Sequence, residues 1–174
     1  MPLYTRTELA TLLGDNTAGA LQPVHIRAIL ENFLLVFINW GISNSSTPFP
    51  TFTGAWQLAS GLNGVGEKSN FADPATGEVT IPVAGRYQLG YDVNLSAANA
   101  SGGDIEIGIF RNPTGTPAEI KVLRTEIPVG AKRAAKIPLV VSFATDDKIG
   151  VAFKGPTGEQ VIVEDATLTL ERID

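Results

Sequence analysis

Residues 76–93 constrain the fold more than any other stretch, because their apolar residues alternate as in two β-strands joined by a tight corner at Gly85. A period of two sends successive side chains to opposite faces of a strand, so each apolar set marks one buried face. The alternating apolar residues are Val79, Ile81, Val83, Tyr87, Leu89, Tyr91 and Val93. The stretch has no nucleophile beside a base and no cluster of metal ligands. The stretch therefore predicts a structural β-element rather than a catalytic site.

Further short strand patterns follow, with glycine-marked turns between them. The predicted strands span residues 55–58, 67–72, 78–83, 86–94, 104–111, 119–126, 135–144, 148–154 and 160–172. No helical period separates them, which favours an antiparallel β-sandwich over alternating strands and helices. The residues that we expect in its core are Tyr87, Leu89, Tyr91, Ile107, Ile109, Val141, Phe143, Val151, Phe153 and Leu168.

The first forty residues follow a helical pattern instead. Pro23 suits the first turn of a helix and Gly41 its end, which predicts a helix over Pro23–Asn39. Its main apolar repeat alternates intervals of three and four residues, as in a coiled-coil seam. The repeat consists of Ile26, Ile29, Phe33, Val36 and Trp40. The spacing alone leaves two interpretations open, a helical hairpin within one chain or a seam around a threefold axis.

A polar segment with two prolines, residues 43–50, separates the two patterns. Such a composition is incompatible with a helix and typical of a linker. We therefore expect three parts: a helical attachment and trimerisation module over residues 1–42, the linker over 43–50, and a β-domain over 51–174.

Composition limits the partners of the chain. The net charge is −5, and no basic stripe is available to neutralise phosphates, so we expect no nucleic-acid partner. The longest apolar run, Phe33–Ile38, is too short to span a bilayer, so we expect no membrane partner. Only 18% of the residues are charged, and so low a value hints at burial of surface in an assembly.

Candidates for catalysis or metal binding are few. The only histidine, His25, falls in the helical module, where we interpret it as a cap or interface side chain. Two carboxylate pairs, Asp104 with Glu106 and Asp146 with Asp147, have the residue types of a glycosidase site. A solvated strand face explains the first pair equally well, and the second pair falls in a segment that we assign to a turn below, from a family resemblance. We therefore expect no catalytic residue, no metal and no cofactor.

Two other features have structural interpretations. Lys132, Arg133 and Lys136 form a small basic cluster that we expect to be solvated. Trp40 and Trp56 flank the linker, and we interpret them as core or interface anchors rather than as a sugar-stacking pair.

The run from Gly77 to Val93, with Pro82, Gly85 and Tyr87 at fixed spacing, resembles the signature of the C1q/TNF-like jelly roll. The order of later segments is also similar to that family: a middle strand ending in Asn112, the hairpin 139–151 with its acidic turn, and the closing strand 166–172. The resemblance covers about residues 55–174. It implies a ten-stranded sandwich that assembles as a compact homotrimer, and it favours the threefold interpretation of the helical seam.

The amino-terminal residues carry a second resemblance. Residues 7–19, which contain Glu8-Leu9 and Asp15-Asn16, followed by Pro23 to Arg27, are similar to a small helical module of tailed-bacteriophage virion proteins. In those proteins the module precedes a fibre, decoration or adhesin domain. This resemblance implies a phage particle as the location of the chain.

Together these patterns predict a mainly β, C1q/TNF-like jelly roll preceded by a small helical module, acting as a non-enzymatic virion protein. We expect a homotrimeric head decoration or head-fibre protein on the particle surface, with a capsid or tail protein as partner. The trimer interface would include Ile26, Ile29, Phe33, Val36 and Trp40. The alternatives are a tail-fibre or baseplate receptor binder, a carbohydrate-binding adhesin that recognises a host-surface glycan, and, as a third hypothesis, a hydrolase.

Overall fold

The computed structural model describes residues 36–42, 48–59, 64–69, 71–72, 76–99, 103–114, 117–127 and 132–173. The predicted helical module before residue 36 lies outside the described residues, and with it Ile26, Ile29, Phe33 and His25. Most of the predicted linker, residues 43–47, also lies outside them.

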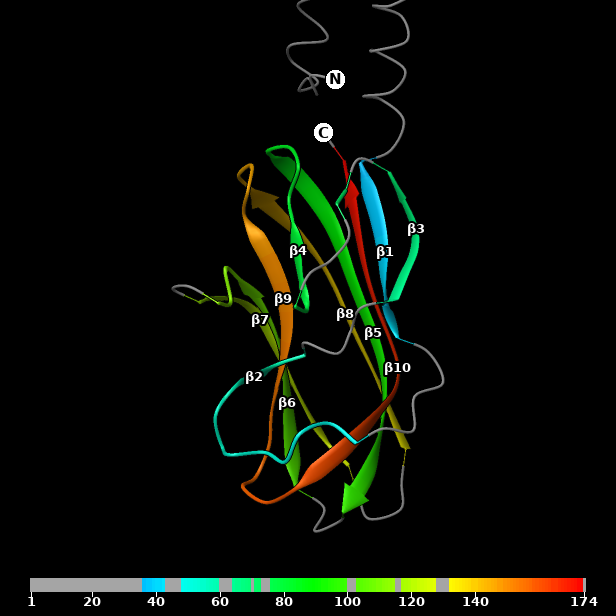
Figure 1. The fold of residues 1–174 in the computed structure, drawn as a ribbon, viewed down its shortest axis with the longest axis vertical. Helices are drawn as coiled ribbons and strands as arrows, with labels where there is room; N and C mark the ends of the chain where they lie inside the picture. The colour runs from blue at the N-terminus through cyan, green and yellow to red at the C-terminus, as the bar shows by residue number, and fades with distance from the viewer. Residues whose placement is uncertain are drawn as a thin grey trace, which may run out of the picture.

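Within these ranges the chain forms ten β-strands and no helix (Figure 1). The strands are β1 (Phe37–Ile42), β2 (Gln57–Leu58), β3 (Gly64–Ser69), β4 (Glu78–Thr80), β5 (Gly85–Asn99), β6 (Asp104–Arg111), β7 (Ala118–Glu126), β8 (Lys132–Phe143), β9 (Lys148–Lys154) and β10 (Gln160–Arg172). They build two antiparallel sheets. Sheet A has the order β3-β1-β10-β5-β8, and sheet B has the order β2-β9-β6-β7 with β4 also paired to β9. The predicted antiparallel sandwich is confirmed.

The core lies between the two sheets. On β5, Tyr87, Leu89 and Tyr91 are fully buried, while the residues between them are exposed or half-buried, as the alternation predicts. Nine of the ten residues expected in the core are buried. Val141 is only partly buried, because β8 is an edge strand of sheet A and has a neighbouring strand on one side only.

The corner around Gly85 connects the sheets rather than two neighbouring strands. β4 pairs with β9 in sheet B, whereas β5 lies between β10 and β8 in sheet A. The connection is held to the turn between β8 and β9, since the Ile81 N–H donates to the Asp147 carbonyl at 2.8 Å and the Ile81 carbonyl accepts from the Asp146 N–H at 2.9 Å. The corner therefore closes the sandwich at one end.

The predicted helix is wrong at its carboxyl end, because Phe37–Ile42 form strand β1. This strand pairs with β10, where Trp40 lies opposite Leu168, and with β3. Val36 and Trp40 are 3% and 1% exposed in the core of a single chain, so they do not lie on a seam between chains. Residues 36–42 thus belong to the sandwich and not to the attachment module in which we placed them.

Close packing of β1 on β10 explains the glycine that we interpreted as a helix end. A Cβ atom at Gly41 would overlap the carbonyl oxygen of Ala166 on β10. Only glycine allows the two backbones to approach this closely.

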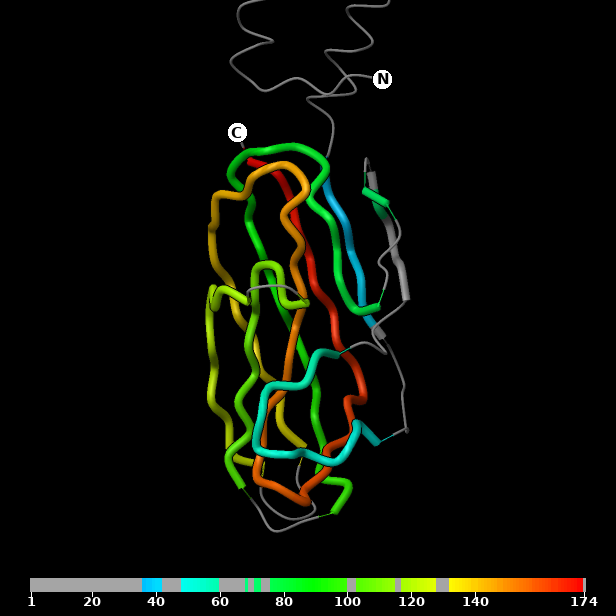
Figure 2. Tube along the Cα trace, turned by 60° about the vertical axis from the view of Figure 1, so that its left-hand side comes forward, coloured from blue at the N-terminus to red at the C-terminus, as the bar shows by residue number. Residues whose placement is uncertain are grey.

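The two ends of the sandwich differ (Figures 1 and 2). The Arg172 N–H donates to the Val36 carbonyl at 2.9 Å, so the chain enters the sandwich beside the end of its last strand. At the opposite end, the loop 155–159 between β9 and β10 packs on the segment before β2, where the Gly158 N–H donates to the Phe52 carbonyl at 2.9 Å. Val36 and the loop 155–159 therefore lie at opposite ends of the sandwich (Figure 1).

Candidate functional site

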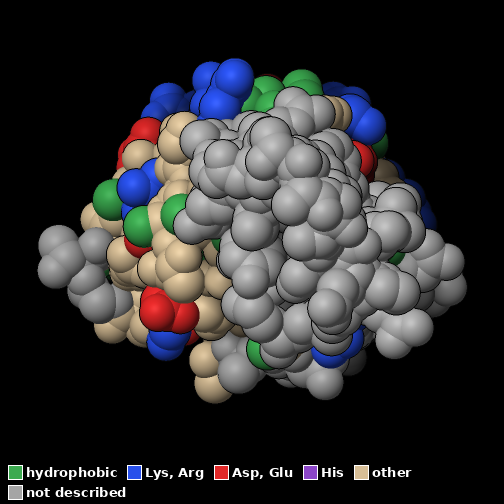
Figure 3. Space-filling model, turned by 90° about the horizontal axis from the view of Figure 1, so that it is seen from above, with side chains coloured by type: hydrophobic (Ala, Val, Ile, Leu, Met, Phe, Trp, Pro, Cys, Tyr) green, Lys and Arg blue, Asp and Glu red, His purple; other side chains and the backbone are tan. Residues whose placement is uncertain are grey.

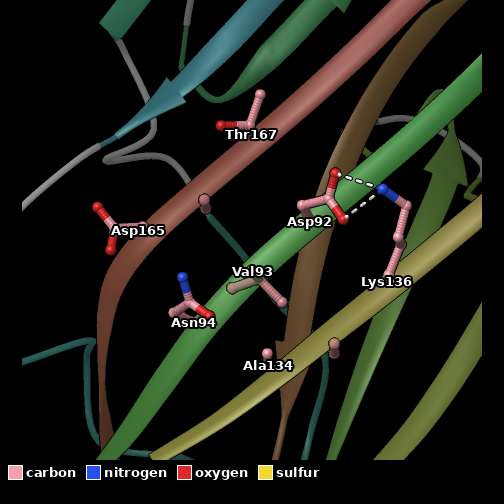
Figure 4. Close-up of a pocket in the computed structure, with 9 residues that line it drawn as sticks. Asp92, Val93, Asn94, Ala134, Lys136, Asp165 and Thr167 are labelled. Carbon is pink, nitrogen blue, oxygen red and sulfur yellow. Dashed lines mark hydrogen bonds and ion pairs between the residues drawn. The ribbon is translucent and has the colours of Figure 1, made fainter.

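The outer face of sheet A carries a shallow hollow of about 400 Å³ (Figure 4). Small side chains make the space: Ala134 lies between the longer Lys132 and Lys136 on β8, and the register of β10 shifts between Val163 and Asp165. The hollow is lined by Asp92, Val93, Asn94, Ala134, Ala135, Lys136, Asp165, Ala166 and Thr167. Sequence reasoning did not find this hollow, since its residues come from three strands that are far apart in the chain.

The charged groups around the hollow are paired. Lys136 Nζ lies 3.2 Å from an Asp92 carboxylate oxygen across the β5–β8 ladder, and both side chains are largely exposed. Lys132 Nζ lies 2.8 Å from Glu164 on β10. Hydrogen bonds from Lys132 and Ser96 hold the pKa of Glu164 below its usual range. Exposed pairs such as these contribute little to stability but lower the net charge of the face.

The predicted basic cluster is therefore not a basic patch. Lys132 and Lys136 point to acidic partners on β10 and β5, and the Arg133 Nε donates to the Glu126 carbonyl at 3.2 Å. Around the end where the chain enters the sandwich, the visible rim carries both positive and negative side chains (Figure 3).

One large apolar side chain projects from the same face of sheet A. Val140 on β8 is 52% exposed, whereas Leu139 and Val141 beside it turn inward and pack against the core. Pro138, also exposed, lacks an N–H and protects this edge strand from pairing with another strand. The outer face of sheet A thus has both a hollow and a projecting valine.

Glu106, a candidate for acid–base chemistry, is engaged on the outer face of sheet B. One of its carboxylate oxygens accepts from Arg124 and the other from Lys154 Nζ at 3.1 Å. The hydrogen bonds from Arg124 and then Lys154 lower the pKa of Glu106. A carboxyl group held in its ionised form cannot act as a general acid near neutral pH. Asp104 lies exposed at the start of the same strand.

The second carboxylate pair forms a turn, as we interpreted it. Asp146 has a φ of 66°, the left-handed conformation that aspartate tolerates in turns. The Asp147 carboxylate accepts from the Ala144 N–H at 2.8 Å and lies 3.5 Å from Arg111 Nε. Within the described ranges no three histidine, cysteine or acidic side chains gather as they would around a metal ion.

Sequence reasoning missed one buried charge. Glu78 on β4 is only 6% exposed, and one of its oxygens accepts from the N–H of Thr114 at 3.2 Å and from its hydroxyl at 2.9 Å. Lys148 Nζ lies 3.6 Å from the other oxygen. The carboxylate ties the β6–β7 turn to the start of β9, so its role is structural. Glu78 precedes Val79 in the alternating pattern, so a period of two alone would put its side chain on the exposed face.

The two tryptophans differ, since only Trp40 has the fully buried anchoring position that we expected. Trp40 is 1% exposed in the core, and Trp56 is half-buried just before β2, with its ring centroid 5.0 Å from that of Phe110. In the part of the chain that the structure describes, no helical segment has the length and hydropathy needed to cross a membrane.

No protein-family model and no curated protein matches the chain. Solved structures do match by shape. An Eiger TNF from S. frugiperda gives a TM-score of 0.62 at 9% identity, covering 80% of this chain and 93% of that one. The globular domain of zebrafish complement 1qA gives 0.57 at 13% identity over 80% and 98%, and murine APRIL gives 0.53 at 13% over 79% and 98%. These likenesses establish the C1q/TNF-like jelly-roll fold, and at such identities they establish the fold alone.

Proposed function

We propose that the chain is a non-enzymatic structural protein that forms a homotrimer on the surface of a tailed-phage particle. The observation that carries the assembly is the outer face of sheet A, which combines a hollow, a projecting apolar side chain and internally paired charges. The resemblance of residues 7–27 to a phage virion module supports the location. The fold and the residue patterns that resemble C1q and TNF proteins support a threefold arrangement.

The hollow and Val140 lie on one face but at different heights along β8, so they can serve a head-to-tail contact. In such a contact a patch on one copy packs against a different patch on the next, and three copies close the ring. Val140 of one copy would approach the hollow of its neighbour. Burying that side chain between copies removes apolar surface that a lone chain leaves in water.

The two ends of the sandwich suggest how the trimer is oriented. Because the chain enters beside the end of β10, residues 1–35 would hold the particle at that end. The contact between copies would then continue through Ile26, Ile29 and Phe33. Val36 and Trp40 would take no part in it, because they are buried in the core of the single chain. The end that carries the loop 155–159 would point outward. We favour head decoration or a head fibre over a tail fibre, because the predicted attachment module would be followed by a short linker and one knob.

A substitution on the sheet A face tests the assembly. Val140→Lys places a charge at an exposed position, so it leaves the single chain folded but should break the trimer by burying an unpaired charge between copies. Thr53→Lys adds the same charge at an exposed position at the far end and should leave the trimer intact. A trimer that survives Val140→Lys would refute this contact.

Co-sedimentation tests the location. Purified chain mixed with particles that lack it should remain bound through repeated washing, and a chain without residues 1–35 should not. Binding by the shortened chain alone would contradict the assigned role of the module. Release of sugar from host polysaccharide, abolished by Asp104→Asn, would overturn the non-enzymatic assignment.

A receptor-binding tail fibre is the alternative. The outer face of sheet B, which the proposed assembly leaves in solvent, is the observation that favours it.

A further inference from the structure

The outer face of sheet B carries an aromatic platform, which we define as Trp56 and Phe110. Trp56 immediately precedes β2, whose Gln57 and Leu58 lie opposite Phe153 and Ala152 of β9. The two rings meet edge to face, with centroids 5.0 Å apart and planes inclined by 70°. Phe110 is 7% exposed, whereas Trp56 keeps part of its indole in solvent.

Glycine beneath the platform fixes its position. A Cβ atom at Gly108 on β6 would lie 2.9 Å from Trp56 Cζ3 and would overlap the ring of Phe110. The rings therefore rest directly on the strand backbone. Because the sheet and the Phe110 ring already hold the indole, a ligand that stacks on it loses little affinity to the entropic cost of ordering this side chain.

Hydrogen-bond donors border the platform. Lys154 Nζ lies 5.8 Å from the Trp56 ring centroid and 3.1 Å from a Glu106 oxygen. Arg124 binds the other oxygen of the same carboxylate, and its side chain is 65% exposed. One carboxylate thus serves two cations, and each cation has further N–H donors beyond the one that it gives to Glu106. Asp104 also acts on Arg124 at longer range, whereas Lys154 lies beside the indole.

An aromatic face next to unused cationic donors matches one class of ligand, a sugar ring that bears a carboxylate. The C–H face of a sugar is apolar and stacks on an aromatic ring, while its carboxylate and hydroxyl oxygens accept from Lys and Arg. A neutral sugar would use the ring but not the charge. Nucleic acid fits poorly, because the chain has a net charge of −5 and the donors here are only two.

We propose that Trp56, Phe110, Lys154 and Arg124 form a binding subsite for an acidic saccharide on the outer face of sheet B. The indole would stack on the sugar ring, and Lys154 and Arg124 would hold its carboxylate. Glu106 orients both cations and is a positioning residue.

Tryptophan fluorescence of the full chain tests this proposal directly. The chain has two tryptophans, and Trp40 is buried in the core, so a ligand-dependent change reports on Trp56. The probe is trigalacturonate, and the matched neutral probe is a trisaccharide of galactose. We expect a saturable change with trigalacturonate and at least about tenfold weaker binding of the neutral sugar, as loss of a charge-assisted hydrogen bond predicts.

Variants assign the effect to the site. Lys154→Gln should weaken trigalacturonate binding about tenfold, and Arg124→Gln should weaken it several-fold. Lys136→Gln removes a lysine from the other sheet, where it is more exposed than Lys154 (70% against 38%), and should leave trigalacturonate binding unchanged. Trp56→Ala should abolish binding, and Trp56→Phe should restore part of it. If Trp56→Ala fails to fold, Lys154→Gln and Arg124→Gln still test whether the sugar binds at this subsite.

Three results would overturn the proposal. They are no saturable change with trigalacturonate, equal affinity for the neutral sugar, and equal effects of Lys154→Gln and Lys136→Gln. The subsite does not depend on the oligomeric state, so a monomeric chain that passes these tests would refute the assembly and keep the subsite.

Discussion

Two tyrosines on one strand provide a sharp test of what stabilises the sandwich. Tyr87 and Tyr91 both lie on β5, point into the core and are 0% exposed. The hydroxyl of Tyr87 donates to the Val83 carbonyl at 2.7 Å. The hydroxyl of Tyr91 has no hydrogen-bond partner among the described residues. Burial raises the pKa of Tyr91 above its ordinary value.

Replacing each tyrosine with phenylalanine removes the same oxygen but should have opposite effects. Tyr87→Phe loses a buried hydrogen bond and leaves the Val83 carbonyl unsatisfied, which costs about 1–2 kcal/mol. Tyr91→Phe removes a hydroxyl that is desolvated without compensation, and this should increase the free energy of unfolding by about 1 kcal/mol. The two variants should therefore differ by about 2–3 kcal/mol in stability.

Urea denaturation followed by far-ultraviolet circular dichroism measures this difference. For a chain of this size 1 kcal/mol corresponds to about 2–4 °C in Tm, so thermal unfolding should shift in opposite directions for the two variants. All samples need the same protein concentration, because an oligomer has a concentration-dependent stability. Equal losses of stability in both variants would refute the reasoning, since the Tyr91 hydroxyl would then have a partner.

Three further substitutions test separate parts of the structure. Gly41→Ala should destabilise the fold by about 1–3 kcal/mol, because the new Cβ atom meets the backbone of Ala166. Gly90→Ala is its control: the new Cβ atom meets only the side chain of Thr169, so urea denaturation should show a smaller loss of stability. Glu78→Ala should cost about 1–3 kcal/mol, since it removes the acceptor of the part-buried hydrogen bonds from the Thr114 N–H and hydroxyl, and an unchanged urea midpoint would contradict this role. Glu106→Gln should reduce the loss of stability in acid. The pKa of Glu106 in the folded chain lies below its ordinary value of 4.5, so the ionised carboxylate stabilises the fold above that pH and ceases to do so as the pH falls through the folded pKa. Urea midpoints at pH 7 and pH 3 would measure this difference between the variant and the unchanged chain.

The sequence was most informative where alternation was regular. Tyr87, Leu89 and Tyr91 identify β5 without any knowledge of its neighbours, because a strand buried on one face imposes a strict period of two. The acidic turn was predicted from the family resemblance, and the left-handed conformation of Asp146 agrees with it.

Strand β1 could not be predicted in the same way. Val36 and Trp40 fit a helical spacing of four, and with Ile38 they also fit an alternation of two. The pairing that selects the strand comes from Leu168 and its neighbours on β10, more than a hundred residues later in the chain. Local pattern cannot decide between two periods when the deciding contact is this distant.

The two candidate surfaces were also hidden in the sequence. The hollow forms only when Asp92, Ala134 and Asp165 are brought together from three strands. The platform depends on Gly108 and Phe110 of β6 beneath Trp56, which lies about fifty residues earlier. Register across a sheet determines both surfaces, and register depends on every strand at once.

Light-scattering mass of the full chain, measured over a range of concentrations, tests the central claim most directly. The account predicts about three times the chain mass of 18.4 kDa, falling to a single chain in Val140→Lys and unchanged in Thr53→Lys. A full chain that scatters as a monomer at every concentration would contradict the homotrimer and the surface on sheet A that we assign to it.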